Sequence, residues 1–439
     1  MKFDISNLIF LILFSFSIFL FYKNFKRIIR NIRLGQGGVQ SNNKKERWKR
    51  VLFIAFGQSK MFKKPLVAFL HLIVYLGFII INIEVVEIII DGLFGTHRVL
   101  SFMGNFYNFL IGSFEVLAFL VLFACVIFLI RRNIIRIKRF WSTEMKGWPT
   151  MDGNLILIFE ILLMSAFLIM DASDLILQDK NPSYYHKAGS FPISSFIAPL
   201  FSNLSVDSLI FIERFCWWFH IVGILAFLNY LAISKHLHIL LAFPSTYYSK
   251  LNPKGQFSNM ESVTKEVKIM LDPSADPFSQ PVENNPVRFG AKDVKDLNWL
   301  QLLNSYSCTE CGRCTSECPA NFTGKKLSPR KIMMDVRDRL EEVGRGIDKN
   351  GVNFNDEKAL LGDYIKPEEL WACTSCNACV EACPINIDPL SIIMDLRRYA
   401  VMEESSAPSE LNSVFSNIEN NGAPWPFPSA ERLKWKDDE

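Results

Sequence analysis

The segment Cys308-Thr-Glu-Cys311-Gly-Arg-Cys314-Thr-Ser-Glu-Cys318-Pro319 recurs, with the same cysteine spacing, as Cys373-Thr-Ser-Cys376-Asn-Ala-Cys379-Val-Glu-Ala-Cys383-Pro384. In each segment three cysteines stand three residues apart, and a fourth cysteine precedes a proline. Three thiolates at this spacing can wrap one face of a cubane iron–sulfur cluster, while the cysteine before the proline points toward the partner cluster. The repeat therefore predicts two [4Fe-4S] clusters in one domain.

The two clusters are expected to exchange their fourth ligands. The expected ligand sets are Cys308, Cys311, Cys314 and Cys383 for one cluster, and Cys373, Cys376, Cys379 and Cys318 for the other. Zinc is the alternative metal, but it favours two separated cysteine pairs in tetrahedral geometry over two repeats of four. Paired clusters can pass an electron between them, so the motif indicates an electron relay and not a substrate site.

The spacer between the motifs is long and helical in pattern. It holds 54 residues, and Ser328-Pro329 within it is typical of a helix start. A bacterial two-cluster ferredoxin is shorter and rich in strands. The region 290–403 instead resembles the alpha-helical ferredoxin of succinate dehydrogenase iron–sulfur subunits and of the C subunit of heterodisulfide reductase.

The half of the chain before residue 240 holds five long apolar stretches, at about 5–22, 66–90, 108–130, 152–171 and 209–234. Each is long enough to cross the ~30 Å hydrocarbon core of a bilayer, which needs about 20 helical residues. The sequence therefore predicts an all-α protein. Its expected parts are a five-helix transmembrane bundle over 1–240, a linker over 241–289, an alpha-helical two-cluster ferredoxin domain over 290–403 and a tail over 404–439.

Loop charges predict the orientation in the membrane. The loops at 23–64 and 131–139 are rich in Lys and Arg, whereas those at 91–107 and 172–208 are poor in them. Because Lys and Arg near helix ends stay on the cytoplasmic side, we expect the N-terminus outside and the cysteine motifs in the cytoplasm. The first stretch has no cleavage site after it and is expected to be retained in the cytoplasmic (inner) membrane.

All six histidines lie before residue 240, and this skew makes haem a cofactor to test. A histidine in lipid is costly unless it is paired or bound. His71 is expected in the inner leaflet, and His238 follows His220 by 18 residues, or roughly 27 Å along a continuous helix. His71 and His238 are therefore expected to share an inner haem, with His236 as an alternative to His238.

The outer leaflet offers fewer histidines. His220 follows Trp217 and Trp218, an interfacial aromatic pair, and is expected near the outer surface. The remaining candidate partner is His97, which requires the 91–107 loop to fold back into the bundle.

The region 1–245 resembles the cytochrome b subunit of respiratory nitrate reductase and its relatives in membrane-bound heterodisulfide-reductase-like enzymes. In that family two histidines 18 residues apart lie on the last helix, and His220 and His238 match them. The family's second helix carries two histidines, whereas this chain has only His71 there. The resemblance therefore implies b-type haem and leaves the number of haems at one or two.

Four carboxyl residues fall inside the predicted membrane helices. A quinone site needs a proton donor or acceptor near the redox centre, and intramembrane carboxyl groups can supply it. The alternative is that these side chains reach the outer surface or bond a neighbouring helix. The candidates are Glu84, Glu87, Glu115 and Glu160.

These features together predict a subunit of a quinone-linked membrane oxidoreductase complex, with activity residing in the complex. It would pass electrons among a cytoplasmic partner, two [4Fe-4S] clusters, haem b and membrane quinone. The alternative function is a membrane-anchored iron–sulfur redox sensor or assembly protein without haem. No phosphate loop, dinucleotide fingerprint or nucleophile triad appears, and no nucleic acid partner is expected.

The resemblance also implies soluble partners. The segment 420–426 looks like the one that, in fused relatives, precedes a cysteine-rich catalytic domain. The implied partner is a separate cytoplasmic cysteine-rich iron–sulfur subunit of heterodisulfide reductase type, docking near the tail. An electron-transfer flavoprotein is a second implied partner. The direction of electron flow is left open, because potentials depend on burial and hydrogen bonds that a sequence does not show.

Overall fold

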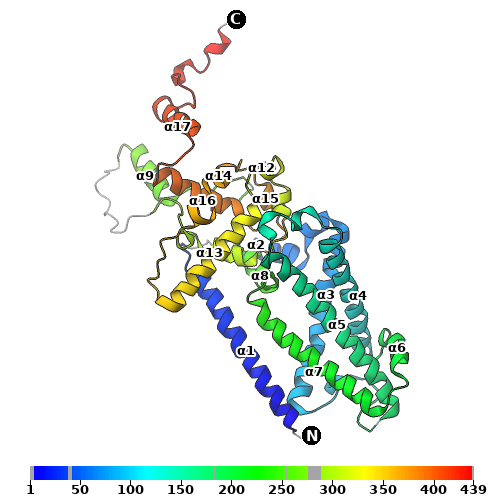
Figure 1. The fold of residues 1–439 in the computed structure, drawn as a ribbon. Helices are drawn as coiled ribbons and strands as arrows, with labels where there is room; N and C mark the ends of the chain where they lie inside the picture. The colour runs from blue at the N-terminus through cyan, green and yellow to red at the C-terminus, as the bar shows by residue number, and fades with distance from the viewer. Residues whose placement is uncertain (1–3, 38–41, 182, 254, 275–287, 438–439) are drawn as a thin grey trace.

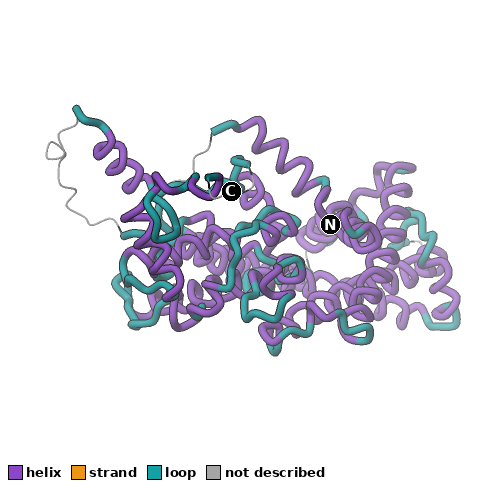
Figure 2. Tube along the Cα trace, turned by 90° about the horizontal axis from the view of Figure 1, so that it is seen from above, coloured by secondary structure: helices purple, strands orange, loops and turns teal. Residues whose placement is uncertain are grey.

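The computed structural model describes residues 4–37, 42–181, 183–253, 255–274 and 288–437. Over these residues it consists of helices and loops, with two isolated bridges and no strand (Figure 2). Long helices stand side by side as a bundle, and a smaller helical body lies on one end of it (Figure 1). The all-α prediction is confirmed.

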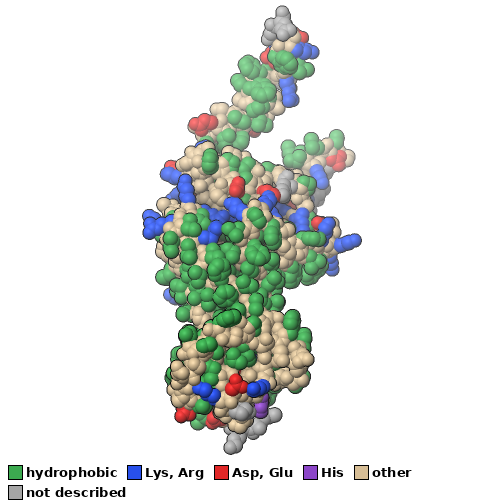
Figure 3. Space-filling model, turned by 90° about the vertical axis from the view of Figure 1, so that its right-hand side faces the viewer, with side chains coloured by type: hydrophobic (Ala, Val, Ile, Leu, Met, Phe, Trp, Pro, Cys, Tyr) green, Lys and Arg blue, Asp and Glu red, His purple; other side chains and the backbone are tan. Residues whose placement is uncertain are grey.

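Within the residues that the structure describes, the bundle contains five helices that are long and apolar enough to span a membrane. They are α1 (Ile5–Ile32), α3 (Pro65–Phe94), α4 (Asn105–Asn133), α5 (Trp148–Lys180) and α7 (Val206–Leu231). Helix α5 packs against both α4 and α7, and α3 packs against α4. The outward faces carry exposed apolar side chains such as Ile12, Phe19 and Phe69. Figure 3 shows an apolar band with Lys and Arg gathered beside the smaller body. The long apolar helices and their exposed apolar faces identify the chain as a membrane protein.

Helix α1 runs about ten residues beyond its apolar stretch because its basic end joins the smaller body. Arg27 Nε lies 2.8 Å from Asp348 of α13 (Pro329–Asn350), and Arg30 pairs with the same carboxylate. The two helices can come this close because of Gly344, where an added Cβ would lie 2.5 Å from the Asn31 side chain. The contact ties the first membrane helix to the cysteine-bearing body.

The last membrane helix ends earlier than predicted. It stops at Leu231, and the Ser234 side chain accepts a hydrogen bond from the His236 amide at 3.0 Å, which caps a new turn. A further helix, α8 (His238–Tyr248), begins at His238. The expectation that His238 continues the helix of His220 is therefore wrong, and so is the depth calculated from a continuous helix.

Helix α8 occupies the start of the segment predicted as a linker. Its Leu241 and Ala242 are buried, and Ser245 donates a hydrogen bond to Asn304 of α10 (Trp299–Ser307) at 2.7 Å. This part of the segment thus belongs to the packing between the two bodies. Helix α9 (Glu261–Leu271) follows and has no buried residue. Residues 254 and 275–287 of the predicted linker lie outside the described residues.

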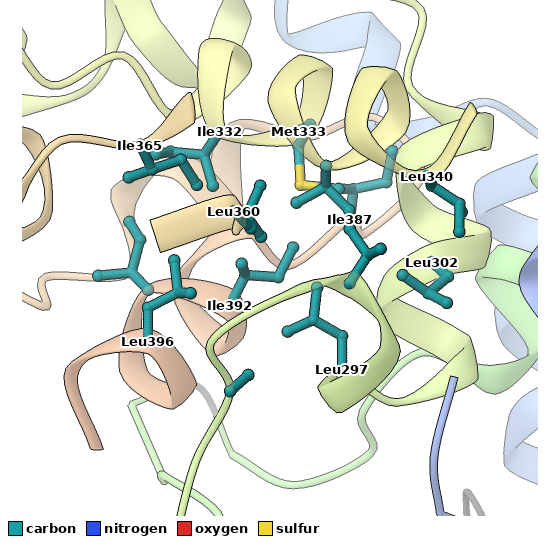
Figure 4. Packing of buried hydrophobic residues seen from close by; sticks show 14 of the residues in the cluster. Leu297, Leu302, Ile332, Met333, Leu340, Leu360, Ile365, Ile387, Ile392 and Leu396 are labelled. Atoms are coloured by element: carbon teal, nitrogen blue, oxygen red, sulfur yellow. The ribbon is translucent and has the colours of Figure 1, made fainter. Parts of the chain in front are cut away.

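The smaller body packs short helices around α13. They are α11 (Arg313–Ser316), α12 (Pro319–Phe322), α14 (Pro367–Trp371), α15 (Ala378–Ala382) and α16 (Pro389–Met402). Leu302, Ile332 and Leu396 are fully buried in its core, which Figure 4 shows from close by. Helix α13 begins where the sequence predicted, since Ser328 caps it and Pro329 occupies its first turn. This core holds the two cysteine motifs in fixed relation.

Candidate redox centres

A cavity of about 780 Å³ lies where the bundle meets the smaller body. Its wall is built from α3, α4, α5 and α7 on the bundle side and from the first cysteine motif on the other. The cysteines in this wall are the first predicted ligand set, Cys308, Cys311, Cys314 and Cys383, together with Cys125 of α4.

The second predicted ligand set lines a separate, small pocket. Its wall holds Cys318, Cys373, Cys376 and Cys379, with apolar neighbours that include Leu327 and Ile393. The structure thus brings the eight cysteines together in the two crossed sets that the motif predicted. Whether each set binds a cluster stays a prediction.

The backbone takes the same course in both motifs. Glu310 and Ser375, one residue before the second cysteine, have left-handed φ angles of 55° and 57°. Gly312 and Asn377, one residue after it, have φ angles of 70° and 60°. Turns of this kind can direct backbone N–H groups toward one concave site, as in many iron–sulfur proteins. The repeat in sequence is therefore also a repeat in conformation, and its form suits an anionic cluster.

The thiols themselves are in surroundings that disfavour the free thiolate. Burial raises the pKa of Cys308 to about 12, of Cys379 to about 12 and of Cys383 to about 11. Metal binding deprotonates a thiol outright, so thiolates would form here only as ligands. In the part of the chain that the structure describes, no three His, Cys, Asp or Glu side chains meet closely enough for a single metal ion.

Four histidines line the large cavity: His71, His220, His236 and His238. Three of them have their Nδ1 within hydrogen-bond distance of an oxygen. Those oxygens are Gln58 Oε1 for His71 (3.0 Å), the Leu163 carbonyl for His220 (3.0 Å) and the Lys235 carbonyl for His238 (3.1 Å). A carbonyl oxygen can only accept, so Nδ1 carries the proton and Nε2 keeps its lone pair. Metal-binding histidines show the same arrangement.

His236 and His97 differ from these three. The ring of His236 packs against Phe227 at 5.2 Å and against His238 at 5.6 Å, and no oxygen fixes its tautomer in the described structure. His97 lies outside the cavity wall, with its ring 5.0 Å from that of Tyr185 and Nε2 3.8 Å from Asp174. The structure therefore does not bring His97 together with His220.

Of the four carboxyl candidates, Glu160 alone lines the cavity among the described residues. Glu115 accepts hydrogen bonds from the Ile193 and Ser194 amides at 2.8 and 3.2 Å. Glu87 accepts from the Leu100 amide at 2.8 Å and from Tyr107 at 3.0 Å. These contacts give Glu87 and Glu115 structural roles between neighbouring segments.

Glu84 belongs to a buried polar network around Arg98, on the loop after α3. Arg98 Nη2 donates to Asp171 and its Nε to Asp174, both at 2.7 Å, and its Nη1 donates to Tyr107 at 3.2 Å. Glu84 Oε2 is buried in the same region without a partner among the described residues. The guanidinium therefore compensates two buried carboxylates at once, whereas Glu84 makes no hydrogen bond through Oε2 within the described structure.

Replacing Arg98 by alanine is expected to lower the free energy of unfolding by about 3–5 kcal/mol, because it leaves buried carboxylates without a counter-charge. Glu84→Gln is the matched control and should change it by less than about 1 kcal/mol, since no described hydrogen bond is lost. Thermal unfolding of the detergent-solubilised protein measures both. Equal stability of the two variants would contradict this account of the network.

Two residues of the site were missed by reading the sequence. Gln58 has a left-handed φ of 49° and orients His71 from a loop, and no sequence pattern singles it out. Arg330 is fully buried at the start of α13, where it donates to the Arg139 carbonyl at 2.6 Å and pairs with Glu144 at 2.7 Å. The sequence predicted the helix that carries Arg330, but no pattern in it indicated that this side chain is buried.

A protein-family comparison agrees with the cysteine geometry. Residues 307–387 match the model of the 4Fe-4S dicluster domain. Together with the bundle, this defines the chain as an iron–sulfur protein with an electron-relay role and a membrane-embedded helical part.

Two proteins that are similar over nearly the whole chain are named as oxidoreductases. Over 98% of its length the chain is 31% identical to the probable iron-sulfur-binding oxidoreductase FadF of Bacillus subtilis, and 28% identical to the EtfAB:quinone oxidoreductase of Syntrophomonas wolfei. It covers 61% and 59% of these two proteins, so it spans about three fifths of their length. Over 23% of the chain and 49% of the relative, it is 36% identical to the C subunit of a CoB-CoM heterodisulfide reductase of Methanosarcina acetivorans. No solved structure matches the chain.

Proposed function

We propose that the chain is the membrane subunit of a quinone-linked oxidoreductase complex and relays electrons between a cytoplasmic partner and membrane quinone. The main support for this proposal is the shared cavity. Its wall includes both His71 and His238 from the bundle side and Cys308 from the first motif. Redox centres on the two sides of such a cavity would be close neighbours.

The bundle side of the cavity suits a b-type haem. About 780 Å³ falls within the range of cofactor sites, which is about 300–1,000 Å³. His71 and His238 are the proposed axial pair, and His220 is the proposed ligand for a second haem. When bound, haem and clusters supply one-electron chemistry. The protein's part is to fix the tautomers of the histidine rings, exclude water from the cavity and hold the cysteine thiols at the proper spacing.

The exposed side of the second pocket is the proposed contact with the soluble partner. Cys376 is exposed, whereas Cys308, Cys311 and Cys314 face the cavity and Cys383 is buried. The relative named an EtfAB:quinone oxidoreductase supports EtfAB as the electron-transferring partner, and the likeness to the C subunit of heterodisulfide reductase supports a cysteine-rich partner protein. The basic side of the bundle in Figure 3 supports placing this body in the cytoplasm.

Glu160 is the proposed proton-transferring residue for quinone. It lies on α5 in the cavity wall, and the structure gives it no hydrogen bond among the described residues. Glu160→Gln should slow the reduction of a short-chain ubiquinone or menaquinone analogue by at least about tenfold, because general acid–base groups contribute on the order of 100-fold or more. Stopped-flow oxidation of the dithionite-reduced protein measures this rate.

Glu84→Gln is the control for that experiment, since Glu84 lies outside the cavity wall. Its rate should match the wild type, and haem and iron contents should be unchanged in both variants. A wild-type rate for Glu160→Gln would remove Glu160 from the proposal. Failure of the wild-type protein to reduce any quinone analogue would overturn the quinone function itself.

The tail is the proposed docking segment for the partner. Helix α17 (Ser409–Asn421) has no buried residue, and Trp435 beyond it is 74% exposed. Exposed apolar groups of this kind mark interaction surfaces. Deleting the residues after Ala407 should lower the rate of reduction by the organism's own reduced flavoprotein at least about tenfold, while reduction by dithionite stays the same. An unchanged flavoprotein rate would count against docking at the tail.

A further inference from the structure

Among the described residues, six cationic side chains line the same cavity as the histidines and the first cysteine set. They are Arg131, Arg132, Arg139, Lys235, Arg313 and Arg330, and we call them the basic belt. Among the described residues of this wall, Glu160 is the one acid. The belt therefore makes the cavity strongly positive at the junction of the two bodies.

Two members of the belt are neutralised by ion pairs. Arg330 pairs with Glu144 at 2.7 Å, and Lys235 pairs with Glu310 at 2.5 Å. The other four, Arg131, Arg132, Arg139 and Arg313, form no direct ion pair within the described part of the chain, although Asp152 and Glu310 attract Arg132 from further away. Arg139 also has a buried Nε without a hydrogen-bond partner there. Uncompensated positive charge in a partly buried wall attracts negative charge.

The belt lies against the first cysteine motif. A Cβ placed on Gly312, between Cys311 and Cys314, would lie 2.4 Å from Arg330 Nη1 and 3.5 Å from Arg139 Cβ. Arg313 is the next residue of the motif itself. Positive charge therefore reaches the first ligand set from both the membrane bundle and its own body. The one carboxylate inside this motif, Glu310, is offset by two cations, Lys235 at 2.5 Å and Arg337 at 2.7 Å.

Lys60 adds a further positive charge on the side of the fourth cysteine. Its Nζ donates to Asn386 Oδ1 at 2.8 Å and to the Val380 carbonyl at 3.3 Å, and each of these residues lies three positions from Cys383. Lys60 comes from a short 3-10 helix (Ser59–Lys63) before α3, on the bundle side. Positive charge thus reaches this ligand set from a third segment.

The second pocket has no such belt. No charged residue lines it within the described structure. Near this pocket, Arg397 donates a hydrogen bond to the Cys373 carbonyl at 2.6 Å. The negative charge of Asp388, which lies near Cys379, is paired with Lys250 at 2.9 Å. These three groups leave a single net positive charge. The two ligand sets therefore sit in different electrostatic surroundings.

This difference has a direct redox consequence. A cluster with four thiolate ligands is anionic, and reduction adds one more negative charge. Fixed positive charges stabilise that state and raise the reduction potential. Solvent near the exposed Cys376 also favours reduction of the second cluster, but charges act more strongly through a buried wall than through water.

We propose that the basic belt holds the reduction potential of the cluster bound by the first ligand set above that of its neighbour. An electron that enters the two-cluster domain then resides mainly on the cluster beside the membrane bundle. The inference rests on the proposed function, because it requires both clusters. Arg139 acts in it as a tuning residue, not as a ligand.

The test is a redox titration of the purified full-length protein followed by electron paramagnetic resonance. In the wild type, the cluster beside the belt should have the higher midpoint potential. Arg139→Gln should lower that potential by at least about 59 mV, which is a tenfold shift in a one-electron equilibrium, and leave the other cluster unchanged. Arg136→Gln is the matched control, since this exposed side chain of the same loop stacks on Trp141 at 5.0 Å. It should shift neither potential.

Cys376→Ser assigns the signals, because it alters or removes the spectrum of the second cluster alone. If Arg139→Gln does not fold, Arg131→Gln replaces it, and the same downward shift is expected. The inference is overturned if the second cluster has the higher potential in the wild type. It is also overturned if the folded belt variant keeps the wild-type potential while both clusters are present. Absence of both cluster signals from the wild type would overturn the proposed function instead.

Discussion

Replacing Cys383 by serine is expected to remove about half of the protein-bound iron, that is, about four of about eight atoms. The cluster lost should be the one held by the first motif, although Cys383 belongs to the second. The reason is geometric, because Cys383 lines the cavity with Cys308, Cys311 and Cys314, while Cys373, Cys376 and Cys379 line the other pocket. Iron analysis of the purified variants measures the loss.

Double variants separate this crossed arrangement from an uncrossed one. Cys308→Ser with Cys383→Ser should lose no more iron than either single variant, because both residues serve one cluster. Cys373→Ser with Cys383→Ser should lose nearly all of it. The opposite pattern would show that each motif binds its own four cysteines. Cys216→Ser is the control for substitution of a buried thiol outside both pockets, and it should retain all the iron.

His238→Ala is expected to abolish binding of the inner haem, whereas His236→Ala should retain it. His238 Nδ1 donates to the Lys235 carbonyl at 3.1 Å, which leaves Nε2 free to act as a ligand. His236 has only ring contacts, with Phe227 and with His238 itself. Losing an orienting partner of a ligating histidine typically costs 10–100-fold in affinity, and losing the ligand costs more. Optical spectra of the dithionite-reduced variants measure the haem.

His71→Ala provides the second arm of this experiment. It should remove the same spectral component as His238→Ala, and the double variant should remove nothing further, because both residues bind one haem. His220→Ala then shows whether a second haem is present. The assignment fails if His236→Ala loses the inner haem while His238→Ala keeps it.

Much of the site could be predicted from the cysteine motif because its chemistry is local. The spacing of Cys308, Cys311 and Cys314 fixes which thiols share one face, and Pro384 marks Cys383 as a ligand for the other cluster. The five membrane helices could also be predicted from the sequence, since an apolar run of about 20 residues is a local signal. Helix α13 began where Ser328 and Pro329 indicated.

The remaining features depend on contacts between distant segments. The break after Leu231 is fixed by Asp152, which accepts a hydrogen bond from the Lys235 amide at 3.0 Å and another from Tyr230 at 2.5 Å. Nothing in the apolar pattern reveals this pairing across some 80 residues. The same holds for Arg98, whose partners Asp171 and Asp174 lie on α5. Intramembrane carboxyl groups can be found in a sequence, but their counter-charges cannot.

The central claim is that one cavity joins a haem in the bundle to the clusters of the smaller body. Haem and iron analysis of the purified wild-type protein, with a dithionite-reduced optical spectrum, tests this most directly. We predict at least one b-type haem and about eight iron atoms per chain. About eight irons without any haem would contradict the account, and the chain would then be better described as a membrane-anchored iron–sulfur redox sensor or assembly protein.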